Sequence, residues 1–412
     1  MKRKIIVIGG GFAGIEFIKK IDETLFDVLL IDKINHHQFQ PLFYQVATSQ
    51  LEPASISFPL RNIFKTKKNL QIRLAEVLSI DSANNKIKTT IGEFCYDLLV
   101  IAIGCTTNFF GNDELKSHAF TLKTTYDAIN IRNHILQTFE NIISAEAGEK
   151  EGLMNLTIVG AGPTGVELAG AFAEIKKNIL PKDYPNIDFT HFKINLIEGS
   201  KDTLNSMSLL AKRTSKIYLQ KMGVNIITET FVKRYDGNFL ELSNGNIIKS
   251  KTVIWAAGVI GNTIKGLPDS VQKVGNRIDV NRTNLVNGTQ NIFALGDIAF
   301  MQTPKYPNGH PQVANVAINQ AKYLAYNLNK TKTNEFEYND LGSMATIGRN
   351  KAVVDLPHFK FKGYFAWLIW MFLHLMLILS VRNKLIIFIN WVWAYLTKDT
   401  SLRLILKQTK NY

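Results

Sequence analysis

Two glycine-rich stretches in this sequence have the spacing of loops that hold phosphate groups. They are GGGFAG at residues 9–14 and GAGPTG at residues 160–165, and both match the pattern GxGxxG. In this pattern the first glycine allows a tight turn, the second lets a pyrophosphate approach the backbone, and the third lets a helix pack on a strand. The glycines predicted to form two dinucleotide-binding loops are Gly9, Gly11, Gly14, Gly160, Gly162 and Gly165.

An acidic residue follows each loop at the end of the next apolar run. Asp32 ends VLLID about 20 residues after the first loop, where a carboxylate accepts hydrogen bonds from ribose hydroxyls. Glu198 in INLIEGS lies farther from the second loop, because PKDYPNIDFTHF inserts extra residues. A carboxylate there would repel a 2′-phosphate, and no arginine follows it closely. We therefore predict that the second site prefers NADH to NADPH.

Two dinucleotide sites in one chain indicate electron transfer between two bound dinucleotides. Two nicotinamides exchanging a hydride would achieve no net reaction, so one dinucleotide is expected to be a flavin. We assign the flavin to the N-terminal loop, with Asp297 in FALGD as a further contact at a strand end.

The elements that must position these loops alternate between strands and helices. Residues 4–8, FDVLLIDK and YDLLVIAIG read as buried strands, and LTIVG, FKINLI and KTVIWA repeat this series later in the chain. TTYDAINIRNHILQTFENIISA is predicted to be a long helix. Such alternation favours parallel, doubly wound sheets, and its repetition favours two domains. The predicted fold class is α/β, with two Rossmann-like dinucleotide-binding domains and a C-terminal helical segment.

The composition limits the partners and the chemistry. The 412 residues carry 48 Lys and Arg against 34 Asp and Glu, a net charge of +14, which indicates an anionic partner. That partner could be nucleic acid, anionic lipid or a phosphate cofactor, and nucleic acid is the least expected of the three, because no zinc-finger spacing and no basic run interleaved with aromatics occurs. Cys95, in the strand-like FCYDLLVIAIG, is predicted to be a buried structural thiol. With Cys105 it forms no CxxC pair, and we expect neither dithiol chemistry nor a metal site.

The C-terminal segment is apolar but short. Residues 365–379 contain one polar side chain, His374, and about 15 helical residues extend about 22 Å, less than the ~30 Å hydrocarbon core of a bilayer. The residues expected at a membrane interface are Trp367, Trp370, Trp391, Trp393, Lys398, Arg403, Lys407 and Lys410, against the single acidic Asp399. We predict peripheral anchoring on anionic lipid, either flat or as a shallow hairpin, and a buried dimer-interface helix is the alternative.

Several segments together resemble the two-dinucleotide-binding-domain flavoproteins, and specifically type II NADH dehydrogenase, the single-subunit NADH:quinone oxidoreductase. They are VIGGGFAGIE, INHHQFQPLFYQVAT, AIG at 102–104, IVGAGPTGVELAGAFAE, WAAGV, IFALGD and RNKLIIFINWVWAYL, so the resemblance covers essentially the whole chain. It implies non-covalent FAD at the first site and NADH at the second. It also implies hydride transfer from NADH to FAD and then passage of two electrons to a membrane quinone, menaquinone or ubiquinone, without proton pumping.

The resemblance also implies domain boundaries and contact residues. The FAD-binding domain would comprise 1–113 and 259–330, the NADH-binding domain 114–258, and the C-terminal membrane-anchoring domain 331–412. The implied FAD contacts are Gly9, Gly11, Phe12, Ala13, Gly14, Asp32, Lys33, Gln45, Ala102, Gly104, Asp297 and Ala314. The implied NADH contacts are Gly160, Gly162, Thr164, Gly165, Glu198 and Gly258.

Three further residues are implied to act in the reaction. Glu167, which follows the second glycine loop in GVELAG, would lie beside the nicotinamide as the catalytic positioning group; its alternative role is to stabilise the helix start. Asn315 and Asn319 occupy the two positions where the family usually has glutamines at the quinone site. The spacing i, i+4 keeps both amides on one helix face, although each is one methylene shorter than glutamine.

Related families of this fold are separated by their cysteines. Disulfide reductases and sulfide:quinone oxidoreductases need reactive cysteines that this chain lacks at the corresponding places. A soluble NADH:carrier reductase of the ferredoxin-reductase type, and an NADH-sensing signalling flavoprotein, remain as alternatives. The expected location is the cytoplasmic face of the cell membrane, and dimerisation through the anchoring region is a further expectation.

Overall fold

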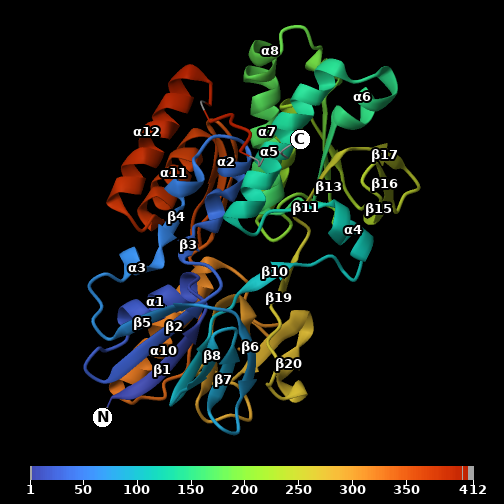
Figure 1. Cartoon of the computed structure of the whole chain (residues 1–412). Coiled ribbons are helices and arrows are strands. Elements are labelled where there is room, and N and C mark those ends of the chain that lie inside the picture. Colours follow the sequence, from blue (N-terminus) through green and yellow to red (C-terminus); the bar gives the residue numbers. More distant parts are fainter. Residues whose placement is uncertain (1, 401, 407–412) are drawn as a thin grey trace, which may run out of the picture. The chain divides into compact units, whose positions relative to one another are not determined.

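The computed structural model describes residues 2–400 and 402–406, which form two compact units (Figure 1). The first unit is built from Met1–Gln38, Phe58–Thr106 and Val259–Asn339. The second unit is built from Phe39–Ser57, Thr107–Gly258 and Asp340–Tyr412. The short strands β3 (His36–Gln38), β4 (Ser57–Pro59), β10 (Cys105–Thr107) and β19 (Val259–Gly261) occur where the chain passes from one unit to the other.

The first unit is organised around a parallel sheet of five strands in the order β22-β9-β1-β2-β5. Its strands are β1 (Arg3–Ile8), β2 (Phe26–Asp32), β5 (Leu70–Leu74), β9 (Leu98–Ile101) and β22 (Ile292–Ala294), with helices α1 (Phe12–Lys20), α3 (Leu60–Ile63) and α10 (Ala314–Lys330). Apolar residues cover both faces of this sheet, as expected for a parallel sheet with helical connections. The doubly wound architecture predicted for the N-terminal loop is therefore confirmed.

Two smaller sheets complete the first unit. They contain β6 (Val77–Asp81), β7 (Lys86–Thr89) and β8 (Gly92–Cys95), and β20 (Gln272–Lys273), β21 (Arg277–Val280) and β23 (Ala299–Met301). Cys95 ends β8 and is exposed, so the prediction of a buried thiol is wrong. The buried strand β9 begins only at Leu98, because Cys95 still belongs to the antiparallel sheet and Asp97 accepts a hydrogen bond from the backbone of Lys4.

The second unit repeats the parallel arrangement in the order β11-β18-β12-β13-β14. The strands are β11 (Phe120–Thr121), β12 (Asn155–Val159), β13 (Lys193–Ile197), β14 (Val224–Ile227) and β18 (Thr252–Trp255). The helices of this region are α4 (Asp113–His118), α5 (Thr125–Ser144), α6 (Ala147–Leu153), α7 (Pro163–Asn178), α8 (Leu180–Asp183) and α9 (Leu209–Lys221). Thr124 and Asp127 form a capping box that fixes where α5, the predicted long helix, begins.

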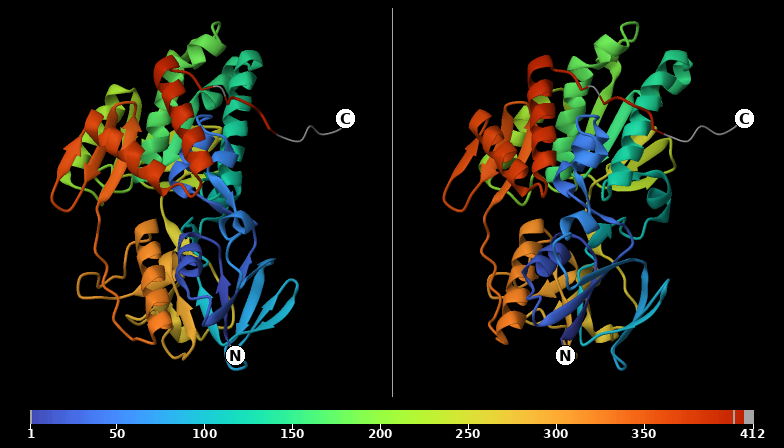
Figure 2. Two further views of the ribbon diagram at one scale, coloured as in Figure 1. Left: turned by 90° about the vertical axis from the view of Figure 1, so that its left-hand side faces the viewer. Right: turned by 60° about the vertical axis from the view of Figure 1, so that its left-hand side comes forward.

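The C-terminal segment and the short helix α2 (Phe43–Ala47) belong to this second unit as well (Figure 2). Two antiparallel sheets add β15 (Val232–Tyr235), β16 (Phe239–Leu242), β17 (Ile247–Lys249), β24 (Ser343–Gly348), β25 (Lys351–Asp355) and β26 (Lys360–Lys362). Gly170 of α7 has no Cβ, and a Cβ would collide with the carbonyl of Ile347, so glycine lets the helix lie directly against β24.

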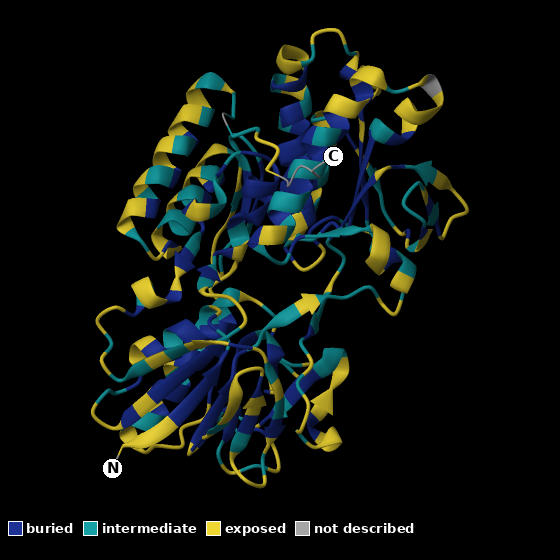
Figure 3. Ribbon diagram, in the orientation of Figure 1, coloured by how far each residue is buried: buried dark blue, intermediate teal, exposed yellow. Residues whose placement is uncertain are grey.

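The apolar tail folds into two helices, α11 (Tyr364–Leu377) and α12 (Val381–Thr397), joined by a short turn. Among the described residues, no helix combines the length and the apolar character needed to cross a membrane. One face of the pair is exposed and apolar, with Phe365 73% and Leu396 72% accessible (Figure 3). We call this α11–α12 pair the C-terminal hairpin.

The polar and aromatic residues of the hairpin do not all face outward as predicted. Trp370 and Trp391 are buried, whereas Trp393 is exposed, because the two buried indoles fill the inner face of the hairpin. Arg403 is paired with Asp183 and Asp399 at 2.6 Å each, so its charge is already compensated. Lys407 and Lys410 lie outside the described residues.

Candidate functional site

The first glycine loop forms the turn between β1 and α1. Gly9 has φ +103°, and a Cβ there would collide with the carbonyl of Ala102 at the end of β9. A Cβ on Gly14 would collide with the carbonyl of Gly9, so the helix can start this close to the strand only with glycine. By contrast, the space above Gly11 is open, and no described side chain caps the N-terminus of α1. The loop thus leaves backbone N–H groups and free volume for a phosphate.

Asp32 holds this loop in shape. Its carboxylate accepts the backbone N–H of Gly10 at 2.5 Å and that of Ile34 at 2.9 Å. Burial raises the pKa of Asp32, while these backbone N–H donors oppose the rise. His37, in strand β3, contacts the Gly10 carbonyl through Nδ1 at 3.3 Å, and burial lowers its pKa to about 4. A neutral His37 and a half-buried carboxylate therefore lie beside the first loop.

The other residues implied for FAD are distributed over both units. Phe12, Ala13, Ala102, Gly104, Asp297 and Ala314 belong to the first unit, and Gln45 belongs to the second. Lys33 is exposed and paired with Glu76 at 2.5 Å. Asp297 accepts a hydrogen bond from the Cys105 thiol at 2.8 Å.

The second glycine loop reproduces the first in the other unit. Gly160 has φ +101°, and a Cβ there would collide with the carbonyl of Ala256 at the end of β18. Glu198 accepts the backbone N–H of Ala161 at 2.6 Å, as Asp32 does for Gly10. The space above Gly162 is open, and no described side chain caps α7. Both predicted loops therefore have the backbone geometry of a dinucleotide site.

Two other residues implied for NADH lie around this second loop. Thr164 is exposed in the first turn of α7. Gly258 follows β18 with φ +131°, and its carbonyl accepts the backbone N–H of Asn108 at 3.1 Å. Glu198 also accepts the backbone N–H and the hydroxyl of Ser200, both at 2.8 Å, which fixes its carboxylate.

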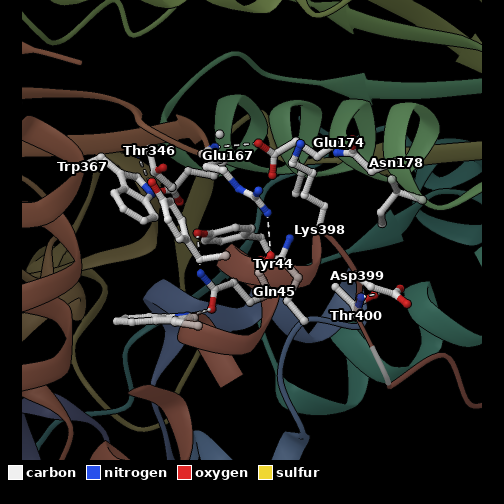
Figure 4. A pocket seen from close by; sticks show the side chains of 18 of the residues that line it. Tyr44, Gln45, Glu167, Glu174, Asn178, Thr346, Trp367, Lys398, Asp399 and Thr400 are labelled. Carbon is white, nitrogen blue, oxygen red and sulfur yellow. Dashed lines mark hydrogen bonds between the residues drawn. The ribbon is translucent and has the colours of Figure 1, made fainter. Parts of the chain in front are cut away.

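A cavity of about 100 Å³ lies in the second unit, lined by residues of α2, α7, the β24–β25 turn and the C-terminal hairpin (Figure 4). We call it the hairpin cavity. The residues that carry its chemistry are Tyr44, Gln45, Glu167, Glu174, Arg349, Trp370, Trp391 and Lys398. Glu167 and Glu174 are two turns apart on α7, so one helix carries both carboxyl groups to the same cavity.

Glu167 is a buried acid of this cavity with a raised pKa. It is buried, and burial raises its pKa to about 8, although the backbone N–H of Thr346 lies 3.4 Å from Oε1 and opposes the shift. The group is therefore largely protonated at neutral pH and can donate a hydrogen bond or a proton. Burial also raises the pKa of Glu174, whose Oε1 accepts the Arg349 backbone N–H at 2.6 Å.

A chain of hydrogen bonds joins α2 to the hairpin at this cavity. The indole N–H of Trp391 donates to Gln45 Oε1 at 2.8 Å, and Gln45 Nε2 donates to the Tyr44 hydroxyl at 2.8 Å. Tyr44 is buried, and its pKa lies well above the usual value because of burial and the carboxyl groups of Glu167 and Glu174. The sequence predicted Glu167 and Gln45, whereas Tyr44, Glu174 and Arg349 were missed, although GVELAGAFAE already shows Glu174 at helical spacing from Glu167.

Asn315 and Asn319 lie on the first turns of α10, in the first unit. Asn319 donates to Asn315 Oδ1 at 3.1 Å, and Asn315 donates to the Tyr338 hydroxyl at 3.2 Å. The predicted spacing thus brings the two amides into contact. Their role toward a quinone stays a prediction.

Comparison with known proteins agrees with this architecture. The model of the pyridine nucleotide-disulphide oxidoreductase family matches residues 3–321, and that of the NDH2 C-terminal domain matches residues 341–398. A type II NADH:quinone oxidoreductase of Mycobacterium tuberculosis is 32% identical over 96% of this chain and 89% of its own length. An internal alternative NAD(P)H-ubiquinone oxidoreductase of Arabidopsis thaliana is 28% identical over 96% of this chain and 84% of its own.

Solved structures show the same fold over almost the full length. NDH2 from Plasmodium falciparum, in complex with NADH, superimposes with a TM-score of 0.91 over 99% of this chain and 100% of its own, at 22% identity. The sulfide:quinone oxidoreductase of Aquifex aeolicus gives 0.73 over 93% of this chain and 92% of its own, at 19% identity. With its two dinucleotide loops and matching C-terminal domain, the chain belongs to the pyridine nucleotide-disulphide oxidoreductase family and, within it, to the type II NADH:quinone oxidoreductases.

Proposed function

We propose that this protein oxidises NADH and passes two electrons, through FAD, to a membrane quinone, without pumping protons. The hairpin cavity carries this proposal, because Glu167, a buried acid of α7 whose pKa is raised to about 8, lines a cavity whose other wall is a hairpin with an exposed apolar face. The relatives named above act on NADH or NAD(P)H and on a quinone, which supports the same pair of substrates here.

The first glycine loop fits FAD. Its open volume above Gly11, the uncapped start of α1 and the half-buried Asp32 together suit a pyrophosphate and an adenosine ribose. When bound, FAD supplies a carrier that takes up two electrons as a hydride and releases them to an acceptor. The residues proposed to hold it are Gly9, Gly11, Phe12, Ala13, Gly14, Asp32, Lys33, Gln45, Ala102, Gly104, Asp297 and Ala314.

The second loop is proposed to hold NADH. Gly160, Gly162, Thr164 and Gly165 surround the pyrophosphate position, and Glu198 and Gly258 flank it. Glu198 keeps its carboxylate at the ribose side, where it would repel the 2′-phosphate of NADPH. The main contribution of these residues is to orient the nicotinamide, since a hydride moves directly between two rings held at contact distance.

The hairpin cavity is proposed to receive the quinone head group. Reduction of a quinone to a quinol takes up two electrons and two protons, so the site must supply protons as well as electrons. Glu167 is protonated at neutral pH and Glu174 follows it on the same helix, so both can hold protons for this step. The buried Trp370 and Trp391 exclude water from the inner wall. Asn315 and Asn319, in the first unit, do not line this cavity, and their role toward a quinone stays a separate proposal.

The exposed apolar face of the hairpin is proposed to rest in the membrane interface. Its side chains stay on one side of the pair, which fits a shallow hairpin that dips into the headgroup region without crossing the bilayer. We place the protein at the cytoplasmic face of the cell membrane. A homodimer formed through the same face is the competing use of this surface.

Steady-state turnover of the detergent-solubilised, FAD-loaded enzyme tests the proposal. We expect rapid NADH oxidation with menadione and no comparable rate with a ferredoxin-type protein carrier. NADH oxidation with the carrier alone would overturn the quinone assignment in favour of a soluble carrier reductase. A flavin that is reduced by NADH but reoxidised by neither acceptor would point instead to an NADH-sensing role.

A further inference from the structure

A second cavity in the second unit contains a buried cation that the proposed reaction does not use. It lies between the loop after α2, helices α5, α7 and α8, and residues Thr400 and Arg403, which follow α12. We call it the Arg132 cavity. Its polar lining residues are Thr48, Ser49, Arg132, Asp183, Tyr184, Thr400 and Arg403, and its other walls are apolar.

Arg132 is only 1% exposed, and its guanidinium has no partner among the described residues. None of Nε, Nη1 and Nη2 makes a hydrogen bond to residues 2–400 or 402–406. Burial lowers the pKa of Arg132 from its usual value, and the carboxylate of Glu52 opposes that shift without bonding to the guanidinium. Arginine nevertheless stays protonated in proteins, so a full positive charge with five N–H donors is enclosed here. Leaving such a group unpaired costs several kcal/mol.

The other charges of the cavity neutralise each other. Arg403 binds Asp183 through Nε at 2.6 Å and Nη2 at 3.2 Å. Its Nη1 also binds Asp399, which lines the hairpin cavity instead. Among the charged lining residues, Asp183 offsets Arg403 and Arg132 is left without a counter-charge.

The end of the described chain closes this cavity. Leu406 exchanges two backbone hydrogen bonds with the side chain of Asn133, the residue after Arg132, at 2.8 and 2.9 Å. Together with the Arg403–Asp183 pair, this contact holds residues 402–406 against α5 and α8. The segment thereby separates Arg132 from bulk water, which raises the benefit of a bound counter-ion.

The size of the cavity limits what can enter. It offers about 20 Å³ to a water-sized particle, which favours a single small ion over phosphate, sulfate or a lipid headgroup. Thr48 and Ser49 line it as well; the Thr48 hydroxyl already donates to the Tyr44 carbonyl at 2.8 Å, whereas the Ser49 hydroxyl can turn toward an anion. We propose that the Arg132 cavity binds a single halide ion, chloride under ordinary conditions. This ion pairs with the Arg132 guanidinium and stabilises the folded second unit.

The proposal predicts a halide-specific gain in stability of the FAD-loaded protein. Thermal unfolding is followed by intrinsic fluorescence in NaCl, NaBr and sodium gluconate at equal ionic strength, so that general screening cancels. We expect the midpoint in chloride and bromide to lie about 2–4 °C above that in gluconate, with saturation at rising halide. Arg132→Gln should abolish the difference, whereas Arg382→Gln, which removes an exposed arginine of α12, should preserve it.

Two further measurements decide the outcome if Arg132→Gln does not fold. Arg132→Lys keeps the positive charge but loses the planar set of N–H donors. A higher halide concentration should then be needed to reach half of the stabilising effect. Crystals grown in bromide should show one anomalous peak beside the Arg132 guanidinium. Equal midpoints in chloride and gluconate, or a water without anomalous signal at that position, would overturn the proposal. Neither readout depends on NADH or quinone turnover, so failure here leaves the proposed reaction untouched.

Discussion

At the scale of single residues, the proposed proton transfer depends on the carboxyl group of Glu167, which helix α7 carries into the hairpin cavity. The sequence shows that Glu167 follows the second glycine loop. Its protonation, however, depends on burial by α2, β24 and the hairpin, which are distant from Glu167 in the chain. Burial by these elements raises its pKa to about 8. A prediction about proton transfer therefore became possible only with the fold.

Replacing Glu167 by glutamine should slow quinone reduction. The amide can still donate a hydrogen bond but cannot release a proton, so the quinone-dependent kcat should fall by about 10–100-fold. In the wild type this rate should decline as pH rises through about 8, because Glu167 loses its proton there. The variant should not show this decline. Stopped-flow measurement separates the two half-reactions. A variant with an unchanged rate of reoxidation by menadione and an unchanged pH profile would contradict the role.

The same substitution should change how stability depends on pH. The pKa of Glu167 is raised in the folded state, so between its usual value and about 8 the folded protein binds more protons than the unfolded chain. Stability is therefore lost as pH rises through this window. Glu167→Gln removes the contribution, and its melting temperature relative to wild type should increase from pH 6 to pH 9. Thermal scans of the FAD-loaded proteins at both pH values test this; a constant difference would show that Glu167 does not titrate there.

The third prediction at the scale of single residues concerns the preference for NADH over NADPH. If Glu198 holds its carboxylate beside the ribose of NADH, as we propose, kcat/KM for NADH should exceed that for NADPH by at least about tenfold. Glu198→Gln keeps the shape of the side chain but removes its negative charge. It should therefore lower the ratio of kcat/KM for NADH to kcat/KM for NADPH. Exposed Glu229→Gln is the matched control and should leave the ratio unchanged. Comparable activity of the wild type with both nucleotides would refute the assignment.

At the scale of elements, the spacing of apolar residues and the positions of glycines predicted the parallel strands and both strand–loop–helix turns. These features depend on local sequence patterns. Cys95 was misplaced because one apolar stretch in the sequence crosses from the antiparallel strand β8 into the buried strand β9. The hairpin was ambiguous for a different reason. Its residues are apolar on nearly all sides, so only packing reveals that Trp370 and Trp391 point inward while Phe372 and Leu385 point outward.

This division of faces makes membrane binding testable without disturbing the cavity. Phe372→Glu and Leu385→Glu each place a charge on an exposed position, 60% and 58% accessible. Each should weaken binding to anionic vesicles by about 1–3 kcal/mol, while NADH:menadione activity in detergent is retained. Phe231→Glu, at an exposed position of 66% outside the hairpin, controls for lost surface apolarity. Unchanged vesicle sedimentation, combined with loss of dimers on gel filtration, would assign the face to dimerisation.

At the scale of the whole molecule, the sequence predicted two dinucleotide-binding domains and a distinct C-terminal region. It gave no sign that residues 39–57 join the second unit, because that segment follows β2 and β3 within the part of the chain that otherwise builds the first unit. Its attachment depends on contacts such as Asn383, whose amide donates to the carbonyls of Ala54 and Ser55 at 3.0 and 2.9 Å. Hydrogen bonds between residues so far apart in the chain produce no periodic pattern in a single sequence.

The repeated loop geometry, one copy in each unit, predicts that the two cofactors can be lost separately. Gly9→Ala and Gly160→Ala each force a side chain into a backbone carbonyl at φ near +100°, with strain of about 1–3 kcal/mol or more at one loop only. Gly9→Ala should be purified with little flavin. Gly160→Ala should retain its flavin and its reduction by dithionite, but NADH should reduce that flavin at least about tenfold more slowly. Flavin absorbance per protein and anaerobic titration with NADH measure both effects, and the opposite pattern would exchange the two nucleotide assignments.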